Sequence, residues 1–175
     1  KQIQKLTGCV AALSRFISRL GEKALPLYRL LRHTEHFEWT DAATAGLEEI
    51  KVALASNPIL VVPNTGEPML LYIAATHQVV SAVLVVEREI VRHKFPLQNP
   101  VYYVSTVLTP CKSRYPHYQK IAYAVFMASR KLRHYFQECS ITVASEVPLN
   151  NIINNRDGTG RIAKWAIELL PFDIS

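Results

Sequence analysis

The sequence predicts an α/β fold: one mixed five-stranded sheet with flanking helices, preceded by a helical segment at the N-terminus. Three observations lead to this prediction. Residues 1–56 carry apolar side chains at steps of three and four, which is typical of helices. Beyond residue 57, apolar runs shorten to strand length and turn residues separate them. The predicted order there is three strands, a helix, a strand, a helix and a last strand, which one mixed sheet accommodates through right-handed crossovers.

Residues 1–56 are predicted to form three helices. The first has a continuous apolar face and ends at Gly21, a plausible C-terminal cap. The second is short, with Pro26 in its first turn. The third follows Thr40 as N-cap and stops at Asn57-Pro58. The apolar residues that define the first two are Ile3, Leu6, Val10, Leu13, Ile17 and Leu20, then Leu27, Leu30 and Leu31.

Residues 57–175 are predicted to form the sheet and its covering helices. The first three strands, separated by short intervals, form an antiparallel meander: Met69–Ala75, Val79–Glu87 and Pro100–Val107. The remaining predicted elements are a long helix at Tyr118–Gln137, a strand at Ser140–Ser145, helices at Pro148–Asn154 and Arg161–Leu170, and a fifth strand at Phe172–Ile174. Asp157–Gly160 is interpreted as a turn, because it lacks the features of a phosphate-binding loop.

Composition narrows the class of protein. The chain has 175 residues, of which 49% are apolar, so it has enough apolar material for a core and is not disordered throughout. Its net charge of +6 favours an anionic partner, nucleic acid first, although a mildly basic surface without such a role is an open alternative. Only 19% of residues are charged, which suggests apolar surface hidden against a partner or another segment.

Three cysteines, Cys9, Cys111 and Cys139, are scattered, which predicts neither a disulfide framework nor a zinc site and favours a reducing compartment. No apolar run has the length of a membrane span, so no membrane partner is expected. His33 and His36 are interpreted as surface residues because no further metal ligands are predicted nearby. The chain begins at Lys1 without Met, so a fragment of a longer chain is expected.

Motifs in the first part of the chain resemble a known polymerase family. Leu6–Gly8 and Leu13–Arg19 are similar to the end of the reverse transcriptase thumb in gypsy-type (Metaviridae) long-terminal-repeat retrotransposons. The chain also resembles the segment that leads into the RNase H domain of that family, at Phe37–Thr40, Leu47–Lys51 and Asn57–Leu60. The resemblance therefore implies a thumb end and linker over residues 1–56.

Motifs in the second part resemble the RNase H domain itself, whose fold has the element order predicted above. They are Val101–Ser105, Arg114–Pro116, Arg133–Phe136, and Gly160–Trp165 with Phe172-Asp173. Leu71–Ala74 and Ser81–Leu84 are similar to plant elements that carry two RNase H domains. The resemblance implies an RNase H-like domain over residues 57–175, truncated at its C-terminus.

The resemblance also implies where catalytic carboxylates would stand. The family holds two divalent ions with an Asp in the first strand, a Glu in the long helix, an Asp after the fourth strand and one further Asp. Flanking motifs align these positions with Ala74, Ile121 and Ser145, and the fourth falls beyond Ser175. Ala, Ile and Ser offer no carboxylate, which predicts a degenerate site with no catalytic residue and no metal. Glu146 is expected on the face opposite Ser145.

Two groups of cations are candidates for contact with nucleic-acid phosphates. The first helix carries Lys1, Lys5, Arg15 and Arg19, and the long helix carries Lys120, Arg130, Lys131 and Arg133. The basic residues near the end of the long helix are equally explained by the helix dipole.

The resemblance implies a non-catalytic connection, or tether, domain of a retrotransposon reverse transcriptase. It would link the polymerase to a downstream RNase H and contact RNA–DNA hybrid weakly through phosphates, or a partner subunit, with a homo-oligomer possible. No cofactor is expected, and the expected location is a cytoplasmic virus-like particle or the nucleus. Two alternatives stay open: an active RNase H that cleaves RNA in hybrids, and a captured module that binds only protein.

Overall fold

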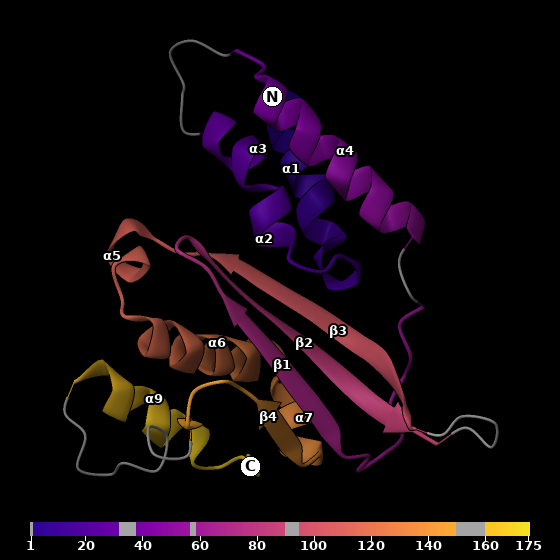
Figure 1. Ribbon diagram of the computed structural model, residues 1–175, viewed down its shortest axis with the longest axis vertical. Coiled ribbons are helices and arrows are strands. Elements are labelled where there is room, and N and C mark those ends of the chain that lie inside the picture. The colour runs from indigo at the N-terminus through magenta and orange to yellow at the C-terminus, as the bar shows by residue number, and fades with distance from the viewer. Residues whose placement is uncertain (1, 32–37, 57–58, 90–94, 150–159) are drawn as a thin grey trace.

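The computed structural model describes residues 2–31, 38–56, 59–89, 95–149 and 160–175. Helices α1 to α4 lie at one end of the long axis of the molecule, and a twisted sheet lies below them (Figure 1). Helices α6, α7 and α9 cover the other side of the sheet (Figure 1). The predicted α/β class, with its mixed sheet and flanking helices, is confirmed.

The helical unit, defined here as α1 to α4, begins differently from the prediction. Instead of one helix up to Leu20, the chain forms α1 (Gln2–Ala12), the 3-10 turn η1 (Ser14–Phe16) and α2 (Leu20–Lys23). Arg19 has a positive φ of 52°, which redirects the chain into α2. Gly21 is therefore inside α2 and is not a C-terminal cap. The apolar spacing still holds because Val10, Ile17 and Leu20 all enter the same core.

The rest of the helical unit agrees with the prediction. α3 spans Leu25–Leu30 with Pro26 in its first turn, and α4 spans Asp41–Ser56. The hydroxyl of Thr40 accepts a hydrogen bond of 3.3 Å from the N–H of Ala43, which confirms the predicted N-cap. Gly46 lets α4 approach α2 closely, because a Cβ there would lie 2.5 Å from the carbonyl oxygen of Lys23. The predicted stop at Asn57-Pro58 lies outside the described residues.

Among the described residues, four strands form the sheet in the order β3-β2-β1-β4. They are β1 (Met69–Ala75), β2 (Val79–Arg88), β3 (Leu97–Val107) and β4 (Ile141–Ala144). β1 is antiparallel to β2 and parallel to β4, so the predicted meander and the parallel return are confirmed. The predicted fifth strand is reduced to a single parallel bridge between Ile141 and Ile174. Its backbone still bonds to β4, since the N–H of Ile141 donates to the carbonyl of Asp173 at 2.9 Å.

The predicted long helix is divided in two. α5 (Pro110–Ser113) leads into α6 (His117–Lys131), and α7 (Arg133–Glu138) follows after Leu132 leaves helical geometry at φ −113° and ψ 30°. The new direction brings the ring of Phe136 to 5.6 Å from that of Phe172. α9 spans Arg161–Leu169, close to the prediction. Most of the predicted Pro148–Asn154 helix and Asp157–Gly160 turn lies outside the described residues.

Two hydrophobic clusters hold the described residues together. The larger one lies between the sheet and α6, α7 and α9, and the smaller one fills the helical unit. Cys9 and Cys111 are exposed and Cys139 is buried, and burial raises the pKa of the Cys139 thiol. None of the helices in the described ranges combines the length and the apolar character that a membrane crossing requires.

Candidate functional site

Three elements bring the predicted carboxylate positions together in one hollow. Ala74 lies near the end of β1, Ser145 directly follows β4, and Ile121 lies in the second turn of α6. Because β1 and β4 are parallel, their carboxyl ends meet at the same edge of the sheet, and α6 begins there. The hollow has a volume of about 490 Å³ and is lined by Tyr72, Ile73, Ala74, Ala75, His117, Ile121, Ala144, Ser145 and Glu146.

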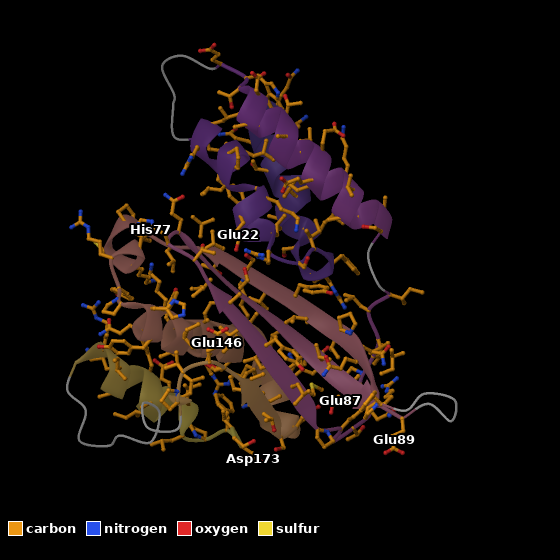
Figure 2. The ribbon with its side chains drawn as sticks, viewed as in Figure 1. Glu22, His77, Glu87, Glu89, Glu146 and Asp173 are labelled. Carbon is orange, nitrogen blue, oxygen red and sulfur yellow. The ribbon has the colours of Figure 1, made fainter. Side chains whose placement is uncertain are left out.

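Glu146 corrects the prediction that strand alternation turns it away. Alternation applies only within a strand, and β4 ends at Ala144. The chain then bends, and the hydroxyl of Ser145 accepts a hydrogen bond of 3.1 Å from the N–H of Val147. Glu146 consequently lines the same hollow as Ser145. Figure 2 labels the position of Glu146. Glu146 contributes the carboxylate of this hollow among the described residues.

The side chains present do not fit a pair of hard divalent ions. Such a pair needs several carboxylates, and the lining offers Glu146 with the imidazole of His117. Ile121 is only 5% exposed and belongs to the large core, so it contributes packing and no ligand. Over the described ranges of the chain, no three His, Cys, Asp or Glu side chains are grouped so that they could hold a metal.

Lys120 is a second correction. The sequence places it among cations available to phosphates, but the residue is only 6% exposed. Its ammonium donates to the carbonyl oxygens of Thr76 and His77, at 3.3 and 3.1 Å. These carbonyls belong to the turn between β1 and β2, so Lys120 ties α6 to that turn. Its ammonium is therefore engaged within the fold and is not available to a phosphate.

The cations of the helical unit differ in whether their charge is exposed and free to contact a partner. Lys5 is exposed on α1, while Lys1 lies outside the described residues. Arg15 is exposed, and its guanidinium lies over the rings of Phe16 and Tyr102, at 5.1 and 5.2 Å. Arg19 forms an ion pair of 2.6 Å with Glu22, which neutralises its charge. Lys5 and Arg15 are therefore the cations of this group best placed for a phosphate.

The other predicted cations form a second group, outside the helical unit. Arg130, Lys131 and Arg133 are exposed where α6 ends and α7 begins. The guanidinium of Arg130 lies 5.6 Å above the ring of Phe126. α7 lies on the other side of the sheet from the helical unit (Figure 1), but Lys131 at the end of α6 lines a hollow together with Ala11 and Ser14 of that unit.

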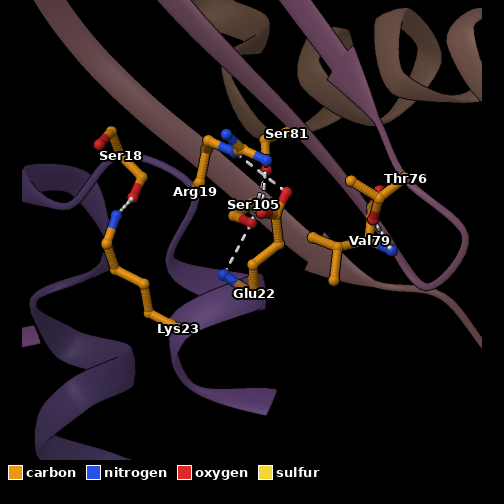
Figure 3. A network of polar contacts seen from close by, with 9 residues as sticks. Ser18, Arg19, Glu22, Lys23, Thr76, Val79, Ser81 and Ser105 are labelled. Atoms are coloured by element: carbon orange, nitrogen blue, oxygen red, sulfur yellow. Dashed lines mark hydrogen bonds and ion pairs between the residues drawn. The ribbon is translucent and has the colours of Figure 1, made fainter. Parts of the chain in front are cut away.

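A polar junction between the helical unit and the sheet is a feature that sequence reasoning missed. The N–H of Gly21 donates to the hydroxyl of Ser105, which is also bonded to the hydroxyl of Ser81 (Figure 3). On the helical side, the ammonium of Lys23 donates to the carbonyl of Ser18 at 2.8 Å (Figure 3). Ser81, within the apolar part of β2, was the available sequence signal.

Comparison with known sequences identifies similar proteins. The model of a family described as "RNase H-like domain found in reverse transcriptase" matches residues 39–143. The Transposon Tf2-3 and Tf2-4 polyproteins of Schizosaccharomyces pombe are each 26% identical to the chain over 178 residues. The match covers 99% of this chain but only 13% of either polyprotein.

Comparison with solved structures shows the same fold. One is foamy viral protease-reverse transcriptase dRH in complex with ds DNA, with a TM-score of 0.73 and 20% identity. That match covers 99% of this chain and 31% of the viral chain. Another is the foamy viral protease-reverse transcriptase in complex with RNA/DNA hybrid, with a TM-score of 0.70 and 19% identity. It covers 99% of this chain and 24% of that one.

Proposed function

Because the chain belongs to the family of RNase H-like domains found in reverse transcriptases, we propose that it is a non-catalytic connection domain. In this role it links a polymerase to a downstream RNase H in a retrotransposon polyprotein and contacts RNA–DNA hybrid through phosphates. The proposal extends to a gypsy-type element of the plant kind that carries two RNase H domains. An RNase H-like fold without its carboxylates can keep such a structural role because fold and active site are separable.

The observation that carries the proposal is the lining of the hollow. Ala74, Ile121 and Ser145 come from three different elements, and each was aligned by a different flanking motif. A neutral residue at one aligned carboxylate position is explained by an error in the alignment. Neutral residues at all three positions, which line one hollow, support the loss of a metal site. With no ion to hold, clustered carboxylates would repel each other, so their replacement by neutral side chains favours the folded domain.

The junction between the helical unit and the sheet supports a mechanical role. Besides the Gly21–Ser105 contact, the guanidinium of Arg29 donates to the side-chain oxygen of Gln78 at 2.9 Å. These contacts join residues far apart in the sequence and attach the helical unit to the sheet and to the turn before β2. A connection domain needs this stiffness, because it transmits the position of one neighbour to the other.

The charge distribution supports hybrid binding by the helical unit. The chain carries a net charge of +6, and Lys5 and Arg15 are exposed cations of this unit without an ion-pair partner among the described residues. The complexes of the foamy viral proteins with ds DNA and RNA/DNA hybrid provide an analogy for this partner. Binding through phosphates would be weak and independent of sequence.

One experiment tests the two parts of the proposal together. A labelled RNA–DNA hybrid is incubated with the protein in Mg²⁺ or Mn²⁺, and its binding is followed by fluorescence anisotropy over a range of salt concentrations. We expect no cleavage. The logarithm of the association constant should fall linearly with the logarithm of the salt concentration. Cleavage that survives further purification contradicts the non-catalytic role, and binding that does not depend on salt contradicts phosphate contact.

A pair of variants locates the contact. Lys5→Gln combined with Arg15→Gln should weaken binding and flatten the salt dependence by about 0.9 for each phosphate that the variant no longer neutralises. The matched control is Arg114→Gln with Lys164→Gln, which removes the same charge from exposed residues outside the helical unit. It should leave the slope of the salt dependence unchanged. An equal reduction of affinity in both variants would mean that only net charge matters.

A further inference from the structure

A groove with two arginines lies between the end of α6, α7 and the end of α9. It has a volume of about 540 Å³ and is separate from the hollow at Ala74. Arg130, Arg133 and Gln137 supply hydrogen-bond donors, whereas Pro171 and Phe172 supply an apolar wall. The remaining lining residues are Ser129 and Glu168.

The two guanidinium groups are available to a ligand. Within the part of the chain that the structure describes, neither Arg130 nor Arg133 forms an ion pair. Arg130 is held over the ring of Phe126, which limits the side-chain entropy that binding would remove. The buried hydroxyl of Ser129 already donates to the carbonyl of Phe126 at 2.9 Å. Two like charges in one groove repel each other until an anion lies between them.

We propose that this groove binds an acidic peptide, in which an Asp or Glu side chain is followed by an apolar residue. The carboxylate lies between Arg130 and Arg133, whose planar groups match it with paired hydrogen bonds. The apolar neighbour packs on Pro171 and Phe172. The inference goes beyond the connection role, because it assigns a protein contact to cations that would otherwise be grouped with the phosphate-binding set.

The lining favours a peptide over nucleic acid for two reasons. The carboxylate of Glu168 faces the same groove and repels a run of phosphates, while a peptide with one acidic side chain avoids it. The apolar wall of Pro171 and Phe172 has no counterpart on a sugar–phosphate backbone.

The test uses the full chain and two probes. The first is a fluorescein-labelled peptide with one Asp-Leu pair flanked by Gly and Ser, with the same peptide carrying Asn-Leu as its uncharged control, and the second is a labelled RNA–DNA hybrid. Arg130→Gln with Arg133→Gln should reduce affinity for the acidic peptide at least tenfold. Hybrid binding and its salt slope should not change. Arg114→Gln with Lys164→Gln, the charge-matched control, should retain peptide affinity.

A second variant removes a negative charge from the groove, so its expected effect on peptide affinity is the opposite. It keeps the proposal falsifiable if the arginine variant loses stability. Glu168→Gln should raise affinity for the acidic peptide, whereas Glu89→Gln, an equal change of charge elsewhere, should not. Three results overturn the proposal: equal affinity for the acidic and uncharged peptides, an equal reduction of affinity in the control pair, or loss of hybrid binding in the arginine variant with peptide binding intact. The last result would assign the groove to nucleic acid.

Discussion

The backbone N–H of Gly21 donates a hydrogen bond of 2.8 Å to the hydroxyl of Ser105, a residue 84 positions further along the chain. The same hydroxyl lies 2.9 Å from that of Ser81 on the neighbouring strand (Figure 3). α2 approaches the sheet this closely only because Gly21 has no side chain. A Cβ at this position would lie 2.7 Å from the Ser105 oxygen and 2.8 Å from a methyl group of Val79.

Gly21→Ala should therefore destabilise the protein, although alanine is the better helix former. The added methyl group forces α2 away from the sheet and weakens the bond to Ser105, at a cost of about 1–3 kcal/mol. Chemical denaturation measures this free energy of unfolding. Gly8→Ala in α1 is the matched control, because a Cβ there meets no atom within 4 Å. It should be neutral or stabilise by up to about 1 kcal/mol. Equal effects in the two variants would contradict a tight junction.

Most of the secondary structure could be predicted because local patterns determine it. β1 has the predicted bounds of Met69–Ala75, since a continuous apolar run between turn residues has few alternatives. The errors occur where tertiary contacts override local preference. Apolar spacing alone could not reveal the left-handed residue at Arg19 or the break at Leu132, because all segments involved still bury their apolar residues.

The candidate site was predictable only in part. Flanking motifs aligned the catalytic positions with Ala74, Ile121 and Ser145, and these residues line one hollow; that they replace lost metal ligands stays a prediction. Glu146 was misplaced because the end of β4 cannot be read to one residue from sequence, and alternation fails beyond it. Lys120 was misplaced because its partners are backbone carbonyls in a distant turn, which carry no sequence signal.

Lys120→Met should lower stability and leave hybrid binding unchanged. The variant keeps an unbranched apolar stem, one atom shorter, but leaves two carbonyls without their donor, at a cost of about 1–3 kcal/mol. Thermal denaturation and the hybrid titration measure the two effects. Lys164→Met, at an exposed position, should change stability by less than about 0.5 kcal/mol. A flatter salt dependence in the Lys120 variant would show that this ammonium does reach a phosphate.

Glu67 should make stability depend on pH in the acid range. Hydrogen bonds from Arg88, at 2.9 and 3.0 Å, and from the N–H of Asn64 lower the pKa of this carboxyl from 4.5 to about 2. Because the folded pKa is the lower one, the contribution to stability is complete above about pH 4.5 and is lost as the pH falls towards 2.

The measurement compares the parent with Glu67→Gln by urea denaturation between pH 7 and pH 2. The parent should be more stable at neutral pH, and the difference should shrink as the pH falls below 4.5. Glu89→Gln, at an exposed carboxylate, is the control and should show no such convergence. A constant difference across the range would mean that Glu67 keeps its ordinary pKa in the folded protein.

The placement of the lost carboxylates can be tested by restoring them with Ala74→Asp, Ile121→Glu and Ser145→Asp in one variant. Without metal it should be less stable than the parent by about 2–5 kcal/mol, because like charges gather and the buried Ile121 loses its packing. Mn²⁺ should recover part of this loss, since it binds only the folded state.

The control for the restored variant has the same shapes without the charges: Ala74→Asn, Ile121→Gln and Ser145→Asn. Thermal melts with and without Mn²⁺ should show a shift in the acidic variant and none in the amide variant. Since Glu146 lines the same hollow, adding Glu146→Gln to the acidic variant should reduce the shift, because a charged carboxylate is replaced by a neutral amide. If Mn²⁺ leaves the acidic variant unchanged, the three positions do not form the lost site, and its assignment rests on family resemblance alone.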